Sequence, residues 1–374
     1  MTQRAYRLEF RKEDVGFVLD RIRASSSCSL VGVGSVGKSN LIAHLMNPAV
    51  LSHYLGDEIS RDVKLINADA NMLAPLPEPA SDALRAWSGY ELLMHRLFMV
   101  FYPFELLSAD EARQFYDIYQ ALQDGRNPLF ATMGLRYFEL ALSYFLRKGI
   151  KIVLILDEFE EALRQLPIKF FQTLRGLRDT YKSQLCFLTF SRSPLPVLVD
   201  RFGLDPLLIE PFLELFNDSV RYIGPYNAQD ALDMVANLSK RSAKPPADTI
   251  VQALLDTTGR FAGLIRAGWF ALDQSPALAI GTPDELATLL CQRKSILLEC
   301  ETIWQSLNNS EQTVLRAVAR LSPYTVNSDT EDAVAMLVQK RLLRVDRSKN
   351  SLFIEPPVFR VYLGTNGLGA DVRG

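Results

Sequence analysis

A short glycine-rich stretch holds the first residues that could do chemistry: Gly32-x-x-x-x-Gly37-Lys38-Ser39. Glycines let the backbone curl so that successive N–H groups point at one anion. The lysine can reach nucleotide β- and γ-phosphates, and the serine hydroxyl can bind Mg²⁺. The expected phosphate site comprises Gly32, Val33, Gly34, Ser35, Val36, Gly37, Lys38, Ser39 and Asn40. The alternative is a glycine-rich turn with a solvated lysine.

Two adjacent acids, Asp157 and Glu158, end an almost wholly apolar strand pattern, "KIVLIL". Open α/β sheets bind ligands at the carboxyl ends of their strands. We expect Asp157 to hold Mg²⁺, largely through its water shell, because this ion keeps several waters. Glu158 would orient and deprotonate the attacking water. Both acids could instead cap the following helix, where negative charge is favourable.

A third strand pattern, "QLCFLTF", ends in Ser191 and Arg192. If it lies beside the strand that ends in Asp157, the Ser191 hydroxyl can touch the attacking water or the γ-phosphate. Arg192 can then stabilise the charge of the transition state. A surface turn is the alternative, because polar residues before prolines commonly mark turns.

The elements that must position these residues alternate between strand and helix patterns, as a parallel sheet requires. Apolar runs predict strands at 28–33, 63–67, 150–156, 184–190 and 220–223. Residues from about 71 to 148 are too many for a loop, so we expect several helices inserted between the second and third strands. The aromatics of this insertion are expected to form a helical core, since aromatics at helical spacing are mostly buried.

Composition limits the classes of protein that the chain can represent. Its 374 residues suit two or three domains, and its net charge of −2 argues against coating nucleic acid or membrane through bulk charge. No apolar run reaches the ~18 residues of a spanning helix, and the charged start is unlike a secretory signal. The four cysteines and three histidines lack zinc-site spacing. We expect a cytoplasmic protein with free, buried thiols.

The C-terminal half divides into two further segments. Helical patterns dominate from 226 to 305, and a helix, a second helix and a β-hairpin follow between 306 and 374. This last order is typical of a winged helix. We therefore predict an ATPase domain at 1–225, a helical lid at 226–305 and a winged-helix domain at 306–374.

The stretches "LVGVGSVGKSNL", "VLILDEFEE", "LTFSR" and "YIGPYNAQDALDMV" together give a family resemblance. The chain resembles STAND-class P-loop ATPases and the related AAA+ ATPases of the origin-recognition type. The resemblance implies an α/β P-loop NTPase fold with a parallel five-stranded sheet in the order 5-1-4-3-2, a helical lid and a C-terminal winged helix. It also implies ATP or ADP with Mg²⁺ as the bound cofactors.

The same resemblance assigns functional residues. Catalysis falls on Lys38, Glu158, Ser191 and Arg192, and further nucleotide contacts fall on Arg7, Pro225 and Arg266. Phe261 and Ala262 replace the histidine and proline of the family's lid motif. An arginine from a neighbouring subunit could complete the site, with Arg175, Arg178 and Arg201 as candidates.

The charges of the last domain bear on its partner. Three acids, Asp329, Glu331 and Asp332, occupy the N-terminal half of the second helix, where a DNA-reading helix meets phosphates. Basic residues follow at Lys340, Arg341, Arg344, Arg347 and Lys349. They could grip a DNA backbone or form a solvated rim. We favour regulatory docking over DNA contact for this domain.

Three functions remain open from the sequence. The favoured one is a slow ATP-hydrolysing switch of the STAND type, which passes its nucleotide state to a protein partner or to self-assembly. The alternative is a DNA-binding AAA+ ATPase of the origin-recognition or transposition-regulator kind. A small-molecule kinase is the third, but it leaves the winged helix unexplained.

Overall fold

The computed structural model describes residues 6–123, 128–240, 247–274, 282–320, 322, 327–346, 348 and 351–365. The chain forms two compact units. The first comprises Met1–Val31 and Ile42–Arg221, and the second comprises Gly32–Leu41 and Tyr222–Gly374. The glycine-rich loop is therefore part of the same unit as the C-terminal helices.

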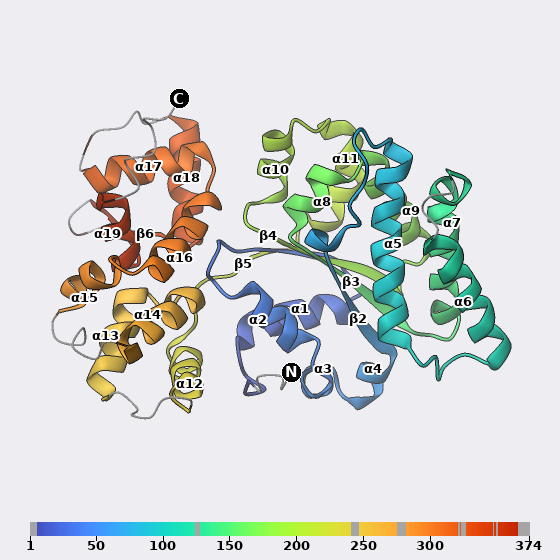
Figure 1. Ribbon diagram of the computed structural model, residues 1–374, viewed down its shortest axis with the longest axis horizontal. Helices are drawn as coiled ribbons and strands as arrows, with labels where there is room; N and C mark the ends of the chain where they lie inside the picture. Colours follow the sequence, from blue (N-terminus) through green and yellow to red (C-terminus); the bar gives the residue numbers. More distant parts are fainter. Residues whose placement is uncertain are drawn as a thin grey trace. The chain divides into compact units, whose positions relative to one another are not determined.

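A five-stranded sheet organises the fold (Figure 1). Its strands are β1 (Cys28–Val31), β2 (Val63–Asp69), β3 (Lys151–Asp157), β4 (Leu185–Ser191) and β5 (Val220–Tyr222). Their order is β2-β3-β4-β1-β5, and β1, β2, β3 and β4 pair in parallel. The α/β class and the predicted order 5-1-4-3-2 are confirmed.

The strand ends differ slightly from the predicted ones. The first strand stops at Val31 rather than at residue 33, because the chain turns into the glycine-rich loop at Gly32. The second strand continues to Asp69, which pairs in register with Asp157. Both differences lie at the carboxyl edge of the sheet.

Helices cover both faces of the sheet. In the first unit they are α1 (Lys12–Arg23), α3 (Pro48–Leu55), α4 (Asp57–Asp62), α5 (Asp82–Phe101), α6 (Ala109–Gln123), α7 (Pro128–Leu146), α8 (Phe159–Gln165), α9 (Ile168–Thr180), α10 (Leu195–Phe202) and α11 (Pro206–Leu213). A large hydrophobic core joins Leu154, Leu156 and Phe187 of the sheet to residues of α5, α8 and α9. Figure 1 shows α5, α8 and α9 on the face of the sheet opposite α1 and α3.

The predicted helical insertion is α5, α6 and α7, in which several of the large aromatics are buried. Phe115, Phe138 and Phe145 are fully buried, and the rings of Phe101 and Phe145 stack with centroids 3.6 Å apart. Tyr102 and Tyr116 are exceptions, because 66% and 46% of their surfaces are exposed. The prediction of an aromatic helical core is therefore confirmed for Phe101, Phe115, Phe138 and Phe145 and wrong for these two tyrosines.

The second unit consists of the loop, the first residues of α2 up to Leu41, and a helical region. Helix α2 (Lys38–Leu45) follows the loop, and the later helices are α12 (Ala228–Ser239), α13 (Asp248–Thr258), α14 (Ala262–Gln274), α15 (Pro283–Leu290), α16 (Lys294–Gln305), α17 (Asn309–Arg320), α18 (Ser328–Gln339) and α19 (Pro357–Thr365). After α17 and α18, β6 (Leu343–Asp346) and β7 (Ser351–Ile354) form an antiparallel hairpin. This is the predicted order of helix, helix and hairpin. The winged-helix assignment and the limits of the domains stay predictions.

All four cysteines are free and buried, as predicted. Burial raises the pKa of the Cys186 thiol to about 12, so this group is held as an unreactive thiol. Among the helices of the described ranges, none combines the length and the apolar character needed to cross a bilayer.

Candidate functional site

The glycine-rich loop turns sharply between β1 and α2. Ser35 and Gly37 adopt φ angles of 67° and 95°, and Lys38 is the first residue of α2. Only glycine adopts such angles without strain, so Ser35 is held in a costly conformation. The first N–H groups of a helix lack acceptors within the helix, and its dipole adds positive charge at that end. Loop and helix start together can therefore receive an anion.

Lys38 is folded onto its own loop. Its Nζ donates a hydrogen bond to the Gly32 carbonyl oxygen at 2.7 Å, and only 8% of the residue is exposed. The next residue, Ser39, is exposed, as a ligand for a hydrated ion must be. This geometry excludes the alternative of a solvated surface lysine.

Helices of the second unit press directly on the loop. A Cβ added to Gly34 would lie 2.5 Å from Thr302 Cγ2 and 2.6 Å from the Thr302 carbonyl oxygen. A Cβ on Gly37 would lie 3.1 Å from both the Ala262 Cβ and the Tyr226 hydroxyl. Glycine is thus required for close packing as well as for φ. The alanine in place of the family's lid proline supplies a small side chain that fits against Gly37.

Two hydrogen bonds fix the loop to this region. Asn40 Nδ2 donates to the Tyr226 hydroxyl at 2.7 Å, and the Gly263 N–H donates to the Ser35 carbonyl at 2.9 Å. Tyr226 follows the predicted Pro225 and is buried, whereas Pro225 is half-buried. Sequence reasoning missed Tyr226 and Gly263. The adjacent Gly-Pro step was the only available signal for the tyrosine.

A carboxylate also reaches the loop. The Ser35 hydroxyl donates to Glu299 Oε2 at 2.5 Å, and Arg266 Nη2 lies 3.5 Å from Glu299 Oε1. Arg266, the predicted lid arginine, is thus paired with an acid of α16. Glu299 was not predicted, because a contact across 264 residues leaves no local pattern in the sequence.

The predicted acids lie in the first unit at the carboxyl edge of the sheet. Asp157 ends β3 and is buried, and one of its oxygens accepts the Glu158 N–H at 2.9 Å. Glu158 adopts a φ of 48°, an uncommon angle that turns the chain sharply into α8. Its Oε2 accepts from Arg192 Nη2 at 2.8 Å. The predicted base and the predicted arginine are therefore brought together as an ion pair.

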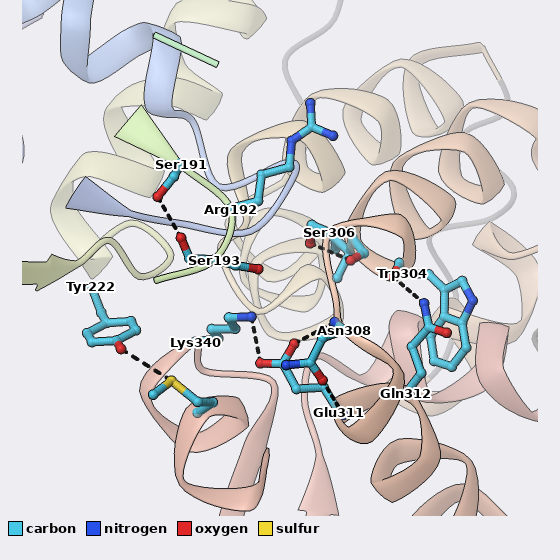
Figure 2. Close-up of polar contacts among 12 residues, drawn as sticks. Ser191, Arg192, Ser193, Tyr222, Trp304, Ser306, Asn308, Glu311, Gln312 and Lys340 are labelled. Atoms are coloured by element: carbon cyan, nitrogen blue, oxygen red, sulfur yellow. Dashed lines mark hydrogen bonds and ion pairs between the residues drawn. The ribbon is translucent and has the colours of Figure 1, made fainter. Parts of the chain in front are cut away.

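The end of β4 lies beside these acids. Sheet pairing sets Leu156 opposite Thr189 and Ser191 opposite Val31, the residue before the loop. The Arg192 N–H donates to Glu160 Oε1. The Ser191 hydroxyl is fully buried and donates to the Ser193 carbonyl at 2.8 Å (Figure 2). A contact of this hydroxyl with water or phosphate, as predicted, would require it to change partner.

The remaining predicted residues are spread over the fold. Arg7 is exposed just before the turn that begins α1. Among the finger candidates, Arg175 pairs with Asp179 and Glu214, Arg178 donates to the Ser25 carbonyl, and Arg201 is exposed near the end of α10. The structure gives no reason to choose one of these three arginines.

Lys340 does not belong to the predicted basic rim. Its Nζ donates to Glu311 Oε1 at 2.6 Å, and the two side chains are 1% and 0% exposed (Figure 2). Glu311 also exchanges hydrogen bonds with Asn308 at the start of α17. Arg344 pairs with Glu355 and lies over the Phe353 ring, while Arg347 and Lys349 lie outside the described residues. Lys340 therefore cannot grip a DNA backbone.

Removing Lys340 should strongly destabilise the second unit. In Lys340→Ala the Glu311 carboxylate is left buried without its cation, which typically costs about 3–5 kcal/mol. Urea unfolding of the full chain measures this loss. Arg344→Ala removes an exposed pair and should cost about 1 kcal/mol or less. Equal stability of the two variants would contradict the role given to the buried pair.

Comparison with known proteins gives fold relations only. No protein-family model and no curated protein sequence matches the chain. The solved structure of the Aeropyrum pernix ORC2 protein, in ADPNP-ADP complexes, is 12% identical, with 98% of this chain and 95% of that chain covered and a TM-score of 0.55. The Walker-type ATPase PABY2304 of Pyrococcus abyssi is 14% identical over 94% and 95% of the chains, with a TM-score of 0.50.

The chain shares the fold of these two proteins. A third structure, the Aeropyrum pernix ORC1 protein in complex with DNA, is 13% identical over 96% and 92% of the chains, at a TM-score of 0.42. The matches to ORC2 and PABY2304 span nearly the whole of each chain. They show a shared fold, as the predicted resemblance to origin-recognition ATPases implied, and they give no support to the narrower STAND assignment.

Proposed function

We propose that the chain is an Mg-ATP-binding and ATP-hydrolysing protein of the AAA+ type. One observation carries the proposal: a loop with Ser35 and Gly37 in left-handed conformations leads from the inner strand β1 into the first turn of α2, with Lys38 against it. Phosphate is the anion that such a loop and lysine fit. The ADPNP-ADP complexes of the ORC2 protein support the choice of an adenine nucleotide.

Several of the predicted residues have a role in the proposed reaction. The loop N–H groups and Lys38 would bind the phosphates. Ser39 and Asp157 are hard oxygen donors of the kind that Mg²⁺ prefers, and the ion would neutralise phosphate charge. Glu158 would accept the proton of the attacking water. Because Arg192 holds Glu158, we propose that this arginine exchanges the carboxylate for the γ-phosphate during turnover.

Thermal unfolding with nucleotide tests the binding step. A ligand at ~100 times its Kd adds ~2.7 kcal/mol of stability, which should raise the Tm by roughly 3–5 °C for a protein of this size. Mg-ATP and Mg-ADP should both give such a rise at millimolar concentration. No shift with either nucleotide would contradict the proposal.

Substitution of Arg192 tests its role in the reaction. Arg192→Ala should keep nucleotide binding but lower the rate of ATP hydrolysis at least ~10-fold, because a charge that stabilises the transition state is lost. Steady-state phosphate release measures the rate. Arg164→Ala removes a nearby surface pair with Glu161 and should leave the rate unchanged. Wild-type turnover in Arg192→Ala would exclude this arginine from the reaction.

DNA association is the second candidate function, and the likeness to the ORC2 protein supports it better than it supports a STAND-type switch. Contact with DNA would not come from the start of α18, because Asp329 and Glu331 lie in its first turn and would repel the phosphates. Fluorescence anisotropy with a labelled duplex at 50–200 mM salt, roughly the range over which phosphate contacts lose most affinity, tests this candidate. Micromolar binding that weakens steeply with salt would favour it. No binding at low salt would favour the nucleotide switch.

A further inference from the structure

We propose that the hydrogen bond between Glu299 and Ser35 holds the phosphate loop against α16, and that nucleotide binding breaks this hydrogen bond. We call this contact the latch. The inference rests on the proposed nucleotide site and concerns its regulation. The Ser35 hydroxyl donates to Glu299 at 2.5 Å, so a carboxylate of α16 is bound to the very loop that must hold phosphate. Glu299 is only 22% exposed, which weakens the screening of its charge by solvent.

The surrounding packing makes this contact tight. A Cβ on Gly263 would lie 2.1 Å from both the Glu299 carboxylate oxygen and the Ser35 hydroxyl, so no larger residue leaves the hydrogen bond intact. The Gly263 N–H also binds the Ser35 carbonyl at 2.9 Å. One turn further along α16, the backbone of Thr302 rests against Gly34. The loop, the start of α14 and α16 therefore form one closed arrangement.

The negative charge of Glu299 determines whether the latch strengthens or weakens nucleotide binding. A carboxylate beside bound phosphates is a repulsive contact between like charges, so phosphate and Glu299 disfavour each other on the loop. Release of Glu299 would also free Arg266, its partner at 3.5 Å, for an anion. Since the coupling between two binding events is reciprocal, a docked α16 weakens nucleotide binding and a bound nucleotide loosens α16.

Three substitutions separate charge, hydrogen bond and sterics. Glu299→Gln keeps the shape but removes the charge, Ser35→Gly removes the hydroxyl, and Gly263→Ala pushes the two side chains apart. Each should lower the Kd for Mg-ATP about tenfold in isothermal titration calorimetry, within the usual range of coupling between sites. Glu301→Gln is the matched control. Glu301 lies on the same helix but binds Tyr362 and Gln305, so its substitution should leave the Kd unchanged.

Amide hydrogen exchange of the wild-type chain tests the latch independently. It needs no variant, so misfolding of a variant cannot affect the result. Amides of residues 294–305 should exchange faster when Mg-ATP is bound. Two results would overturn the latch: Glu299→Gln binds Mg-ATP no more tightly than the wild type, or nucleotide leaves hydrogen exchange in α16 unaffected or slows it. The proposed function would still stand in both cases if the wild type binds Mg-ATP. Absence of binding by the wild type and by all variants would instead refute the proposed function itself.

Discussion

Lys38→Ala abolishes the rise in Tm that Mg-ATP and Mg-ADP give to the wild-type chain. The lysine supplies the point charge of the loop, and its Nζ already lies 2.7 Å from the Gly32 carbonyl at the start of that loop. Truncation to alanine leaves the loop glycines in place but removes the charge that reaches the phosphates. Differential scanning fluorimetry with millimolar nucleotide measures the difference.

The same experiment contains its own control. Lys182→Ala removes an exposed lysine from the turn before β4 and should keep the full nucleotide shift. The Tm of Lys38→Ala without nucleotide shows whether the variant is folded. A full shift in folded Lys38→Ala would mean that this lysine does not bind the nucleotide.

Glu158→Gln should retain nucleotide binding and lose hydrolysis. Glutamine keeps the size of the side chain and can still accept from Arg192, but it cannot take a proton from water. General bases typically contribute about 10²–10⁴-fold to a rate, so phosphate release should fall by that factor. The nucleotide-dependent rise in Tm should stay within error of the wild type.

A neighbouring acid provides the control for this loss. Glu161 lies on α8 within a surface pair with Arg164, so Glu161→Gln should hydrolyse ATP at the wild-type rate. If Glu158→Gln also turned over at the wild-type rate, the base would be another residue. The buried Asp157, one residue earlier, would then be the first candidate to examine.

The sheet could be predicted because its signals are local. Strands buried on both faces are runs of apolar residues, as in β3, and parallel strands direct their carboxyl ends to one edge. That logic placed Asp157 and Ser191 at strand ends, where the structure has them. The exposed Tyr102 and Tyr116 could not be predicted, because helical periodicity does not tell which faces of three packed helices stay open.

The loop itself was also predictable, since glycine spacing and the lysine are adjacent in sequence. Its partners were not. Tyr226 and Glu299 meet the loop across separations of 186 and 264 residues, and a single tyrosine or glutamate carries no periodic signal. Lys340 was misread for the same reason. A charged residue at a helix end is usually solvated, and only the fold reveals the buried Glu311 that pairs with it.

The most direct test of the central claim is a crystal structure of the wild-type chain grown with millimolar Mg-ADP. We expect the β-phosphate within hydrogen-bonding distance of the N–H groups at the start of α2 and of Lys38 Nζ, with Mg²⁺ on the Ser39 hydroxyl. Nucleotide bound elsewhere, or a loop that excludes it at saturating concentration, would contradict the account.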